Sequence, residues 1–375
     1  MSSEPSGEPL FRIGILGATG FIGSPYRAEI RACDNARIIA LCARREDLLE
    51  QAAAEDGALL ATPDWRKVVT HPEVNFVLVA TPDAFHHEAV LFCARHGRHL
   101  LCEKPVGMNA AEAREMLDAC RNARPTLAHF VPFWTRMVEV FRLGRQMVAA
   151  GELGEIRSTV FRWQNPRPEG MPLTWRDNPS LSSAGTVADV GSHAYDLVRW
   201  IIGKEAEQVL AHGETLTDSK PDIGDVNLVE AIEWGGRHNG EEAKRRRGGT
   251  VDYATVCCRF QGGATGVFVL SHATFLRKHL APELELHGTK ASLSLDRWTG
   301  EIRLAAPGQP VRIVHWVDGC EFGNRFQKHV FPALTPILQG RAAALDYPDL
   351  EDGWIAQKFT DAASVSIREG RWVTL

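Results

Sequence analysis

The sequence predicts an α/β protein of two domains, with a parallel sheet first and a mainly antiparallel sheet after it. Three observations lead to this prediction. Apolar runs alternate with helical spacing up to about residue 131, strand-like runs dominate beyond residue 203, and 375 residues exceed the size at which one core keeps growing. We therefore expect a first domain over 11–131 and a second over 132–375, after a disordered tail over 1–10.

The first domain is predicted from short, nearly continuous apolar runs, which are typical of parallel strands covered on both faces. The segments at 84–97 and 109–122 have helical spacing, and Gly97 has the position of a helix C-cap. Strands alternating with helices indicate a doubly wound sheet, so a Rossmann-type domain is expected. The apolar runs are 11–17, 36–43, 74–80, 98–103 and 126–130.

The second domain is expected to hold a large, mainly antiparallel open sheet with helices on one face. A helix over 135–150, a strand over 155–163 and a helix over 187–203 open it, and the glycine pair in "QGGA" (261–264) indicates a hairpin turn. A helix near 350–368 and a short strand close the chain. The further predicted strands are 226–234, 253–260, 264–273, 283–288 and 291–296.

Composition argues against several function classes. The net charge is −5, and the one basic run, "KRRR" at 244–247, lies in a segment that resembles a solvated loop, so neither nucleic acid nor a membrane surface is expected as partner. The eight cysteines include no CxxC pair, so no metal site is expected. The amino terminus lacks the features of a signal peptide, and no apolar run reaches about 20 residues. We expect a cytoplasmic protein with reduced thiols.

The segment "GILGATGFIGSP" follows the first predicted strand and opens a helix, which is the setting of a dinucleotide-binding loop. Glycines at this turn let backbone amides approach a pyrophosphate at the helix amino terminus. The spacing is GxxGxxG rather than GxGxxG, and such a turn also occurs for structural reasons alone. Its βαβ setting favours cofactor binding by Gly17, Thr19, Gly20, Phe21, Ile22 and Gly23.

The end of the second strand predicts which dinucleotide binds. NAD enzymes usually place an acidic residue there, whereas this chain has Ala43, Arg44 and Arg45. Guanidinium groups suit a 2′-phosphate through bidentate hydrogen bonds. The alternative is that exposed arginines simply begin a surface helix. We therefore expect NADP as the preferred cofactor, with NAD possible.

The segment "CEKPVG" at 102–107 places Lys104 at the carboxyl end of a buried strand, where ligands bind in open α/β sheets. A carbonyl that accepts a hydride develops negative charge on oxygen, so an ammonium group there stabilises it. Glu103 is expected to anchor the turn. Lys104 as an ordinary surface lysine is the plain alternative.

In the second domain, Asp189 and His193 are four residues apart, so on a helix they share one face. Histidine titrates near neutrality and can both take and return a proton. A helical histidine beside apolar residues is also often a core group. Trp163, Trp175 and Arg176 lie in or just before the loop at 165–186 and are candidates for substrate contacts, although tryptophans are as often core residues.

The chain resembles the family of glucose-fructose oxidoreductase, inositol dehydrogenase and the rhizopine-catabolism protein MocA. The resemblance rests on "GILGATGFIG", "VATPDAFHHEAVLFCARHGRHLLCEKP", "GELGEIRS", "GTVADVGSHAYDLVRW" and "LEDGWIAQKFTDAA". It implies that Lys104, Asp189 and His193 are catalytic, with His193 as proton shuttle and Asp189 orienting substrate hydroxyls or tuning the histidine. It also implies that Thr81, Pro82 and His86, with Glu103 and Lys104, lie near the nicotinamide.

The resemblance implies an oxidoreductase that moves a hydride between a nicotinamide and a secondary alcohol or ketone of a sugar, inositol or related polyol. Relatives also assemble through the open sheet of the second domain, so a homodimer or homotetramer is expected. Two alternatives remain open at this point. One is a trans-dihydrodiol dehydrogenase or other carbonyl reductase, and the other is a non-catalytic nicotinamide sensor.

Overall fold

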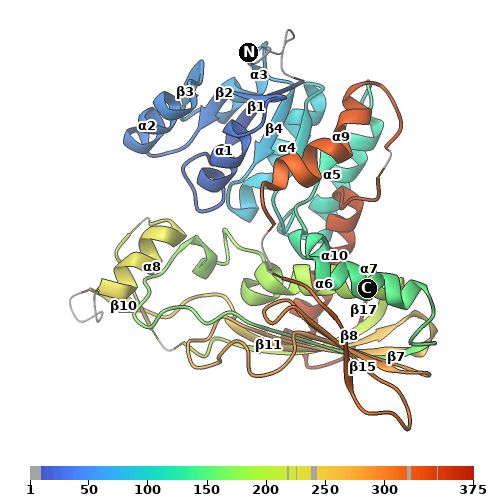
Figure 1. Cartoon of the computed structure of the whole chain (residues 1–375). Coiled ribbons are helices and arrows are strands. Elements are labelled where there is room, and N and C mark those ends of the chain that lie inside the picture. Colours follow the sequence, from blue (N-terminus) through green and yellow to red (C-terminus); the bar gives the residue numbers. More distant parts are fainter. Residues whose placement is uncertain (1–9, 218, 225, 238–242, 319–321, 344) are drawn as a thin grey trace. The chain divides into compact units, whose positions relative to one another are not determined.

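The computed structural model describes residues 10–217, 219–224, 226–237, 243–318, 322–343 and 345–375. The expected disordered tail lies, except for its last residue, outside the described residues. The chain forms two compact units (Figure 1). Unit 1 consists of the described part of Met1–Val106 with Ala111–Pro132 and Gly323–Glu351, and unit 2 of Gly107–Ala110, Phe133–Phe322 and Asp352–Leu375. Residues 323–351 thus belong to unit 1, although the sequence pattern predicts one boundary near 131.

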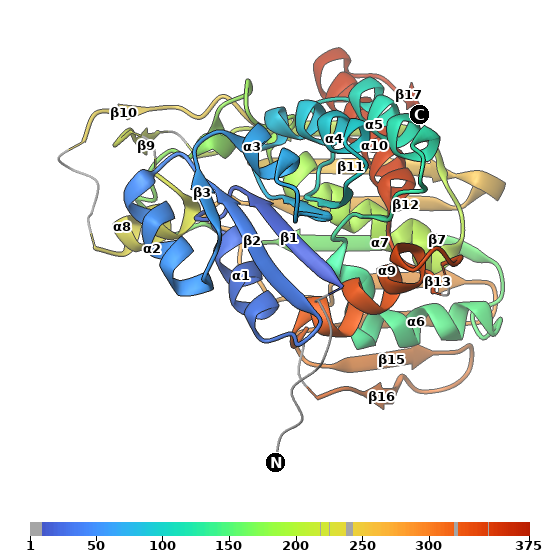
Figure 2. The same ribbon diagram turned by 90° about the horizontal axis from the view of Figure 1, so that it is seen from above.

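Unit 1 is a doubly wound parallel sheet. The strand order is β3-β2-β1-β4-β5-β6, and every neighbouring pair is parallel. Helices cover both faces, α1 and α2 on one and α3, α4 and α5 on the other (Figure 2). The strands are β1 (Phe11–Leu16), β2 (Ala36–Cys42), β3 (Leu60–Thr62), β4 (Phe76–Val79), β5 (His99–Cys102) and β6 (His129–Phe130). The helices are α1 (Gly23–Arg31), α2 (Glu46–Asp56), α3 (Trp65–Thr70), α4 (His86–Arg95), α5 (Ala110–Asn122) and α9 (Phe331–Leu338).

This topology confirms the predicted Rossmann domain. The strand order reverses between β1 and β4, which creates a crevice at their carboxyl ends. β1 and β4 are buried along almost their whole length, which explains their continuous apolar sequences. The segment that returns to this unit packs on its core, since the rings of Phe11 and Phe331 stack 4.1 Å apart.

Unit 2 contains a nine-stranded sheet of order β16-β15-β14-β13-β7-β12-β11-β8-β17. All neighbouring strands are antiparallel except β7 and β12, so the predicted mainly antiparallel sheet is confirmed. The strands are β7 (Ile156–Gln164), β8 (Ala206–Glu214), β11 (Tyr253–Phe260), β12 (Thr265–Ser271), β13 (Leu284–Gly288), β14 (Ser292–Asp296), β15 (Glu301–Ala305), β16 (Arg312–Trp316) and β17 (Val373–Thr374). Two short strands, β9 (Lys220–Pro221) and β10 (Arg245–Arg246), form a separate pair, so the basic run contributes a strand.

Helices cover one face of this sheet (Figure 1). Tyr195 on α7 stacks on Phe359 of α10 at 4.4 Å, and Phe359 also contacts Phe268 of β12. Among the described residues no helix covers the opposite face, where Val267 is 38% exposed. The helices of this unit are α6 (Glu139–Ala149), α7 (Ser192–Ile202), α8 (Leu228–Arg237) and most of α10 (Leu350–Glu369).

One predicted strand is wrong. Residues 226–234, although rich in Val and Ile, form most of helix α8. The three-residue spacing of Leu228 and Ala231 buries both against Met171, and this packing outweighs the β propensity of the segment.

Candidate active site

The glycine loop of unit 1 forms a cradle that larger residues would fill. A Cβ on Gly17, whose φ is +84°, would lie 2.4 Å from the Ala80 carbonyl oxygen at the end of β4, and one on Gly23 would lie 2.2 Å from the Gly17 oxygen. A Cβ on Gly20 would meet only the Gly17 oxygen, at 3.3 Å. Gly17 and Gly23 therefore shape the turn, and Gly20 faces the space that a pyrophosphate would enter.

Backbone donors of this loop are available to an anion. In the described part of the chain, the amides of Phe21 and Ile22 donate to no other group, and both precede α1 directly. The amino terminus of a helix favours negative charge through its unsatisfied N–H groups and its dipole. The loop is tied to β2, because the amides of Gly17 and Ala18 donate to the Cys42 carbonyl at 2.9 and 3.0 Å. The residues present thus fit a dinucleotide.

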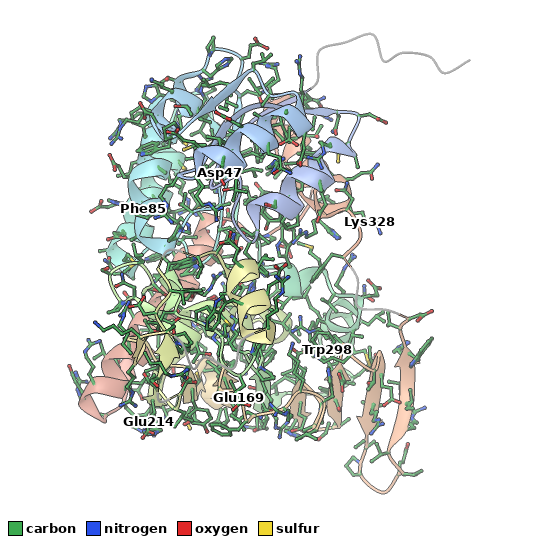
Figure 3. The ribbon with its side chains drawn as sticks, turned by 90° about the vertical axis from the view of Figure 1, so that its left-hand side faces the viewer. Asp47, Phe85, Glu169, Glu214, Trp298 and Lys328 are labelled. Carbon is green, nitrogen blue, oxygen red and sulfur yellow. The ribbon has the colours of Figure 1, made fainter. Side chains whose placement is uncertain are left out.

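The end of β2 lies beside this loop. Ala43 is buried, whereas Arg44 and Arg45 are exposed. Arg45 pairs with Asp47 at 3.2 Å, and this hydrogen bond lowers the pKa of Asp47, which Figure 3 labels. Arg44 follows the strand whose last residue binds the glycine loop, so its position suits a group on the adenosine ribose.

The turn that carries Lys104 is fixed from several sides. The Glu103 amide donates to the Val79 carbonyl at 2.9 Å, which joins the ends of β5 and β4. The hydroxyl of Tyr26, on α1, donates a hydrogen bond to the Glu103 carboxylate. Burial raises the pKa of Glu103, while the bond from Tyr26 acts to lower it. The Lys104–Pro105 peptide bond is cis.

His86 lies beneath this turn rather than on the surface. Its side chain is fully buried, Nδ1 lies 2.9 Å from the Pro105 carbonyl oxygen, and Nε2 lies 2.8 Å from that of Thr81. Desolvation lowers its pKa. The ring thus connects the turn after β4, which includes Pro82, with the turn after β5. A part for His86 in cofactor binding stays a prediction, and it would be indirect.

In unit 2 the predicted catalytic helix starts irregularly. Val187–Gly191 forms a π-helical turn, and α7 follows it directly. π turns are rare and occur often at functional sites. A Cβ on Gly191 would lie 2.8 Å from a methyl carbon of Leu270, so glycine lets this turn approach β12 closely.

Asp189, on the π turn, lies in a polar cluster. Its Oδ2 is 3.2 Å from Arg167 Nη2, 3.2 Å from His272 Nε2 and 3.8 Å from Arg176 Nε. Burial, followed by the charge of Arg167, lowers the pKa of His272 to about 4, so the ring is neutral at pH 7 and donates from Nε2 to the carboxylate. The cavity beside these side chains measures only about 30 Å³, so the cluster is nearly filled.

His193 has different neighbours from Asp189. Its ring stacks on Trp163 of β7, with centroids 5.6 Å apart and planes 27° apart, and meets Phe133 edge-on at 5.7 Å. Trp175 lies under the Arg176 guanidinium, whose central carbon is 4.3 Å from the ring centroid. The predicted residues of unit 2 thus form two groups, Asp189 with Arg176 and Trp175, and His193 with Trp163.

Sequence reasoning missed Arg167 and His272, which contact Asp189. Arg167 follows the carboxyl end of β7, and His272 follows that of β12. These two strands are the one parallel pair of this sheet among the described residues. The Arg167 amide donates to the His272 carbonyl at 3.0 Å. Parallel pairing brings the two following segments together. Arg167 lies in the predicted loop at 165–186, but no local pattern pairs that loop with residue 272.

Two features are absent from the described residues. No group of three or more His, Cys, Asp or Glu side chains there has the arrangement to hold a metal ion. None of the helices in the same ranges combines the length and apolar character needed to cross a bilayer.

A doubly wound sheet with a glycine cradle at its switch point, next in sequence to a mainly antiparallel α/β unit, defines a two-domain dinucleotide-binding protein. Two family models match the chain. One, for an oxidoreductase family with an NAD-binding Rossmann fold, matches residues 11–129, and the other, for a GFO/IDH/MocA C-terminal domain, matches residues 141–294. The chain belongs to the Gfo/Idh/MocA family of oxidoreductases.

Among characterised relatives, levoglucosan dehydrogenase of Pseudarthrobacter phenanthrenivorans is 28% identical over 251 residues, which cover 66% of this chain and 62% of that protein. Myo-inositol 2-dehydrogenase of Thermotoga maritima is 30% identical over 256 residues, which cover 68% of this chain and 67% of that protein. The chain thus matches less than two thirds of the length of levoglucosan dehydrogenase.

Solved structures have the same fold. An oxidoreductase domain protein from Kribbella flavida has a TM-score of 0.82 at 25% identity, covering 97% of this chain and 98% of that one. Levoglucosan dehydrogenase in complex with NADH and levoglucosan has a TM-score of 0.80 at 22% identity, covering 97% and 99%.

Proposed function

We propose that the protein is a nicotinamide-dependent oxidoreductase that acts on a secondary alcohol or ketone of a sugar, inositol or related polyol. The observation that carries the proposal is the hydrogen bond from Tyr26 to Glu103. It joins α1, the helix that follows the glycine loop, to the residue before Lys104 at the carboxyl end of β5. The activities named for the relatives, on levoglucosan and myo-inositol, support this substrate class.

The cofactor is held by the glycine loop, by the turn after β4 with Thr81 and Pro82, and by the end of β2. When bound, the nicotinamide supplies the hydride acceptor for oxidation or the donor for reduction. We propose that Arg44 and Arg45 select NADP, because no acidic residue stands at positions 43–45 and two guanidinium groups do. NAD is the alternative, and the matched family model describes an NAD-binding fold.

Each site residue has a separate role in this proposal. The Lys104 ammonium stabilises the negative charge that develops on the substrate oxygen. His193 takes the hydroxyl proton during oxidation and returns it during reduction, with its ring orientation held by Trp163 and Phe133. Asp189, held by Arg167 and His272, orients substrate hydroxyls.

We further propose that Trp163, Trp175 and Arg176 contact the sugar, the tryptophans through their ring faces and Arg176 through its guanidinium. The proposal includes self-association through the face of the nine-stranded sheet without helices, as a homodimer or homotetramer. We place the protein in the cytoplasm, in keeping with the free thiols of the seven described cysteines.

The test follows nicotinamide absorbance with NADP and NAD in parallel, over a panel of aldoses, inositols, ketoses and trans-dihydrodiols. Turnover is expected with sugars or polyols. Lys104→Met and His193→Asn are each expected to lower kcat by about 100-fold or more, because each removes a group that acts on the reacting oxygen.

Matched controls are Lys67→Met and His287→Asn, which change a surface lysine of unit 1 and a half-buried histidine of β13. Both are expected to keep wild-type turnover. Turnover confined to dihydrodiols would contradict the substrate class. Tight cofactor binding without turnover of any panel member would favour a sensor instead.

A further inference from the structure

Unit 2 contains a second, larger pocket, with a volume of about 310 Å³. The pocket is lined by the end of β7, by the segment 275–281, by Glu283 just before β13 and by Trp298 after β14. A hexose ring fits a space of this size, whereas the cavity beside Asp189 measures about 30 Å³. Of these two cavities, only this pocket has room for a hexose ring.

Two tryptophans line the pocket, Trp163 from β7 and Trp298, which follows β14 and is labelled in Figure 3. One guanidinium lies against both rings, since the central carbon of Arg297 is 4.5 Å from the centroid of Trp163 and 5.0 Å from that of Trp298. Arg297 is 8% exposed, so its contacts with the two rings are largely buried. A pyranose could pack on the open part of each ring, because Trp298 is 45% exposed and Trp163, which also stacks on His193, is only partly buried.

A buried carboxylate on the same wall has one oxygen without a hydrogen-bond donor among the described residues. Glu283 is 5% exposed, and its Oε1 accepts a hydrogen bond from Arg297 Nη2 at 2.7 Å. Its Oε2 is buried and has no hydrogen-bond partner among the described residues. Burial raises the pKa of Glu283 to about 7, although the charge of Arg297 acts in the opposite direction. A ligand hydroxyl that donates to Oε2 would satisfy this atom.

The pocket also carries surplus positive charge. Arg162 is paired with Glu285 at 3.1 Å, and Glu283 with Arg297. Lys278 has no acidic partner within 4 Å in the described ranges, and its Nζ lies 5.2 Å from the Trp298 ring centroid. Arg277 donates to the Thr274 carbonyl and likewise has no carboxylate beside it among these residues. Burial, followed by the charge of Arg297, lowers the pKa of Lys278, and a bound anion would oppose that shift.

We infer that this pocket binds a sugar bearing an anionic group, with its ring against Trp163 and Trp298, a hydroxyl on Glu283 Oε2 and the anionic group at Lys278. Trp163 also stacks on His193, so the sugar would share a wall with the proposed proton shuttle. The inference rests on the proposed function and narrows its substrate to acidic sugars. A carboxylate and a phosphate present the same chemistry to Lys278, and the test separates them.

The test measures binding without turnover, by quenching of tryptophan fluorescence in the full-length protein titrated with D-glucose, D-glucuronate and D-glucose 6-phosphate. One of the two anionic sugars is expected to bind at least 10-fold more tightly than glucose, and which one it is identifies the group. Lys278→Met is expected to abolish that preference while leaving glucose binding within about twofold. Glu283→Gln is expected to weaken the binding of all three sugars, because the side-chain amide has one hydrogen-bond acceptor fewer than the carboxylate.

Lys290→Met is the matched control, because this lysine is exposed on the same unit and lies outside the pocket. It is expected to bind all three sugars as the wild type does. Equal binding of the three sugars, or a preference that survives Lys278→Met, would overturn the inference. If neutral polyols are turned over but anionic sugars do not bind, the inference fails and the proposed function stands. If an anionic sugar binds as described but no sugar is turned over, the proposed function fails instead.

Discussion

The hydroxyl of Tyr26 donates a hydrogen bond to Glu103, the residue before Lys104. Tyr26 belongs to α1, the helix that follows the glycine loop, and its ring is fully buried. The carboxylate that precedes Lys104 is therefore fixed to the helix whose amino terminus follows the glycine loop. The Arg325 guanidinium lies 4.6 Å from the Tyr26 ring centroid and pairs with Glu29, which secures the same helix.

Removal of this hydroxyl should affect catalysis more than folding. Tyr26→Phe keeps the buried ring but leaves one Glu103 oxygen without its donor, which costs about 1–3 kcal/mol and raises the pKa of Glu103 further. We expect kcat/KM to fall by roughly 10-fold, because the Lys104 turn is no longer held in one position. Steady-state kinetics measure the change. Tyr347→Phe, which removes the hydroxyl of a half-buried tyrosine in unit 1, is the control, and an equal loss in both variants would contradict the role of the Tyr26 bond.

Cofactor preference should depend on Arg44. Arg44→Ala is expected to weaken NADPH binding by about 10- to 100-fold, since hydrogen bonds to charged groups contribute about 1.5–3 kcal/mol, and to leave NADH binding within about twofold. Fluorescence titration with the two reduced cofactors measures this directly. Arg66→Ala, an exposed arginine of α3 paired with Glu88, controls for the loss of a surface charge. Equal weakening of both cofactors would refute the selection of NADP by Arg44.

The local sequence pattern predicts those parts of the candidate site that depend on neighbouring residues. Gly17 and Gly23 are identifiable because a turn between a buried strand and a helix demands them, and a Cβ at either position would lie within 2.4 Å of a carbonyl oxygen. The four-residue spacing predicts one shared face for Asp189 and His193, but Asp189 lies on the π turn and His193 on α7, and the two have different neighbours. The partners of these two residues are not identifiable from the sequence, because β7, which carries Trp163, and β12, which precedes His272, are distant in the chain and lie side by side only through their parallel pairing.

Packing between distant segments also explains where the predictions of the fold from sequence are wrong or incomplete. Residues 226–234 have the composition of a strand, but Leu228 and Ala231 are buried against Met171 only if the segment is helical. The return of 323–351 to unit 1 depends on contacts such as Phe11 with Phe331, for which no motif exists. Likewise, the two tryptophans of the large pocket, one on β7 and one just after β14, are distant in sequence.

Self-association should depend on the uncovered face of the nine-stranded sheet. Val267, on β12, is 38% exposed on that face, and Val267→Glu would place a charge where a second copy is expected to pack. We expect the wild type to have at least twice the monomer mass by light scattering and the variant to be monomeric. Leu59→Glu changes a similarly exposed leucine of unit 1 and should leave the mass unchanged. A monomeric wild type would contradict the proposed assembly.

Stability should fall below pH 6.5, and His99 should account for part of the fall. The Ala128 amide donates to His99 Nδ1 at 2.9 Å, so this nitrogen must stay unprotonated, and burial lowers the pKa of His99 to about 4. Because the folded pKa lies below the value of about 6.5 in an unfolded chain, the stabilisation is complete above pH 6.5 and is lost as the pH falls toward 4.

The expected loss from His99 between pH 7.5 and 5.0 is about 1–2 kcal/mol of unfolding free energy. His99→Asn retains an acceptor for the Ala128 amide but does not titrate. Over this pH range its free energy of unfolding in urea should therefore fall by about 1–2 kcal/mol less than that of the wild type. His315→Asn, an exposed histidine of β16, should keep the wild-type pH dependence. If His99→Asn and the wild type lose the same free energy over this range, the Ala128 bond does not control titration at this position, and the remaining pH dependence belongs to other buried groups such as His272.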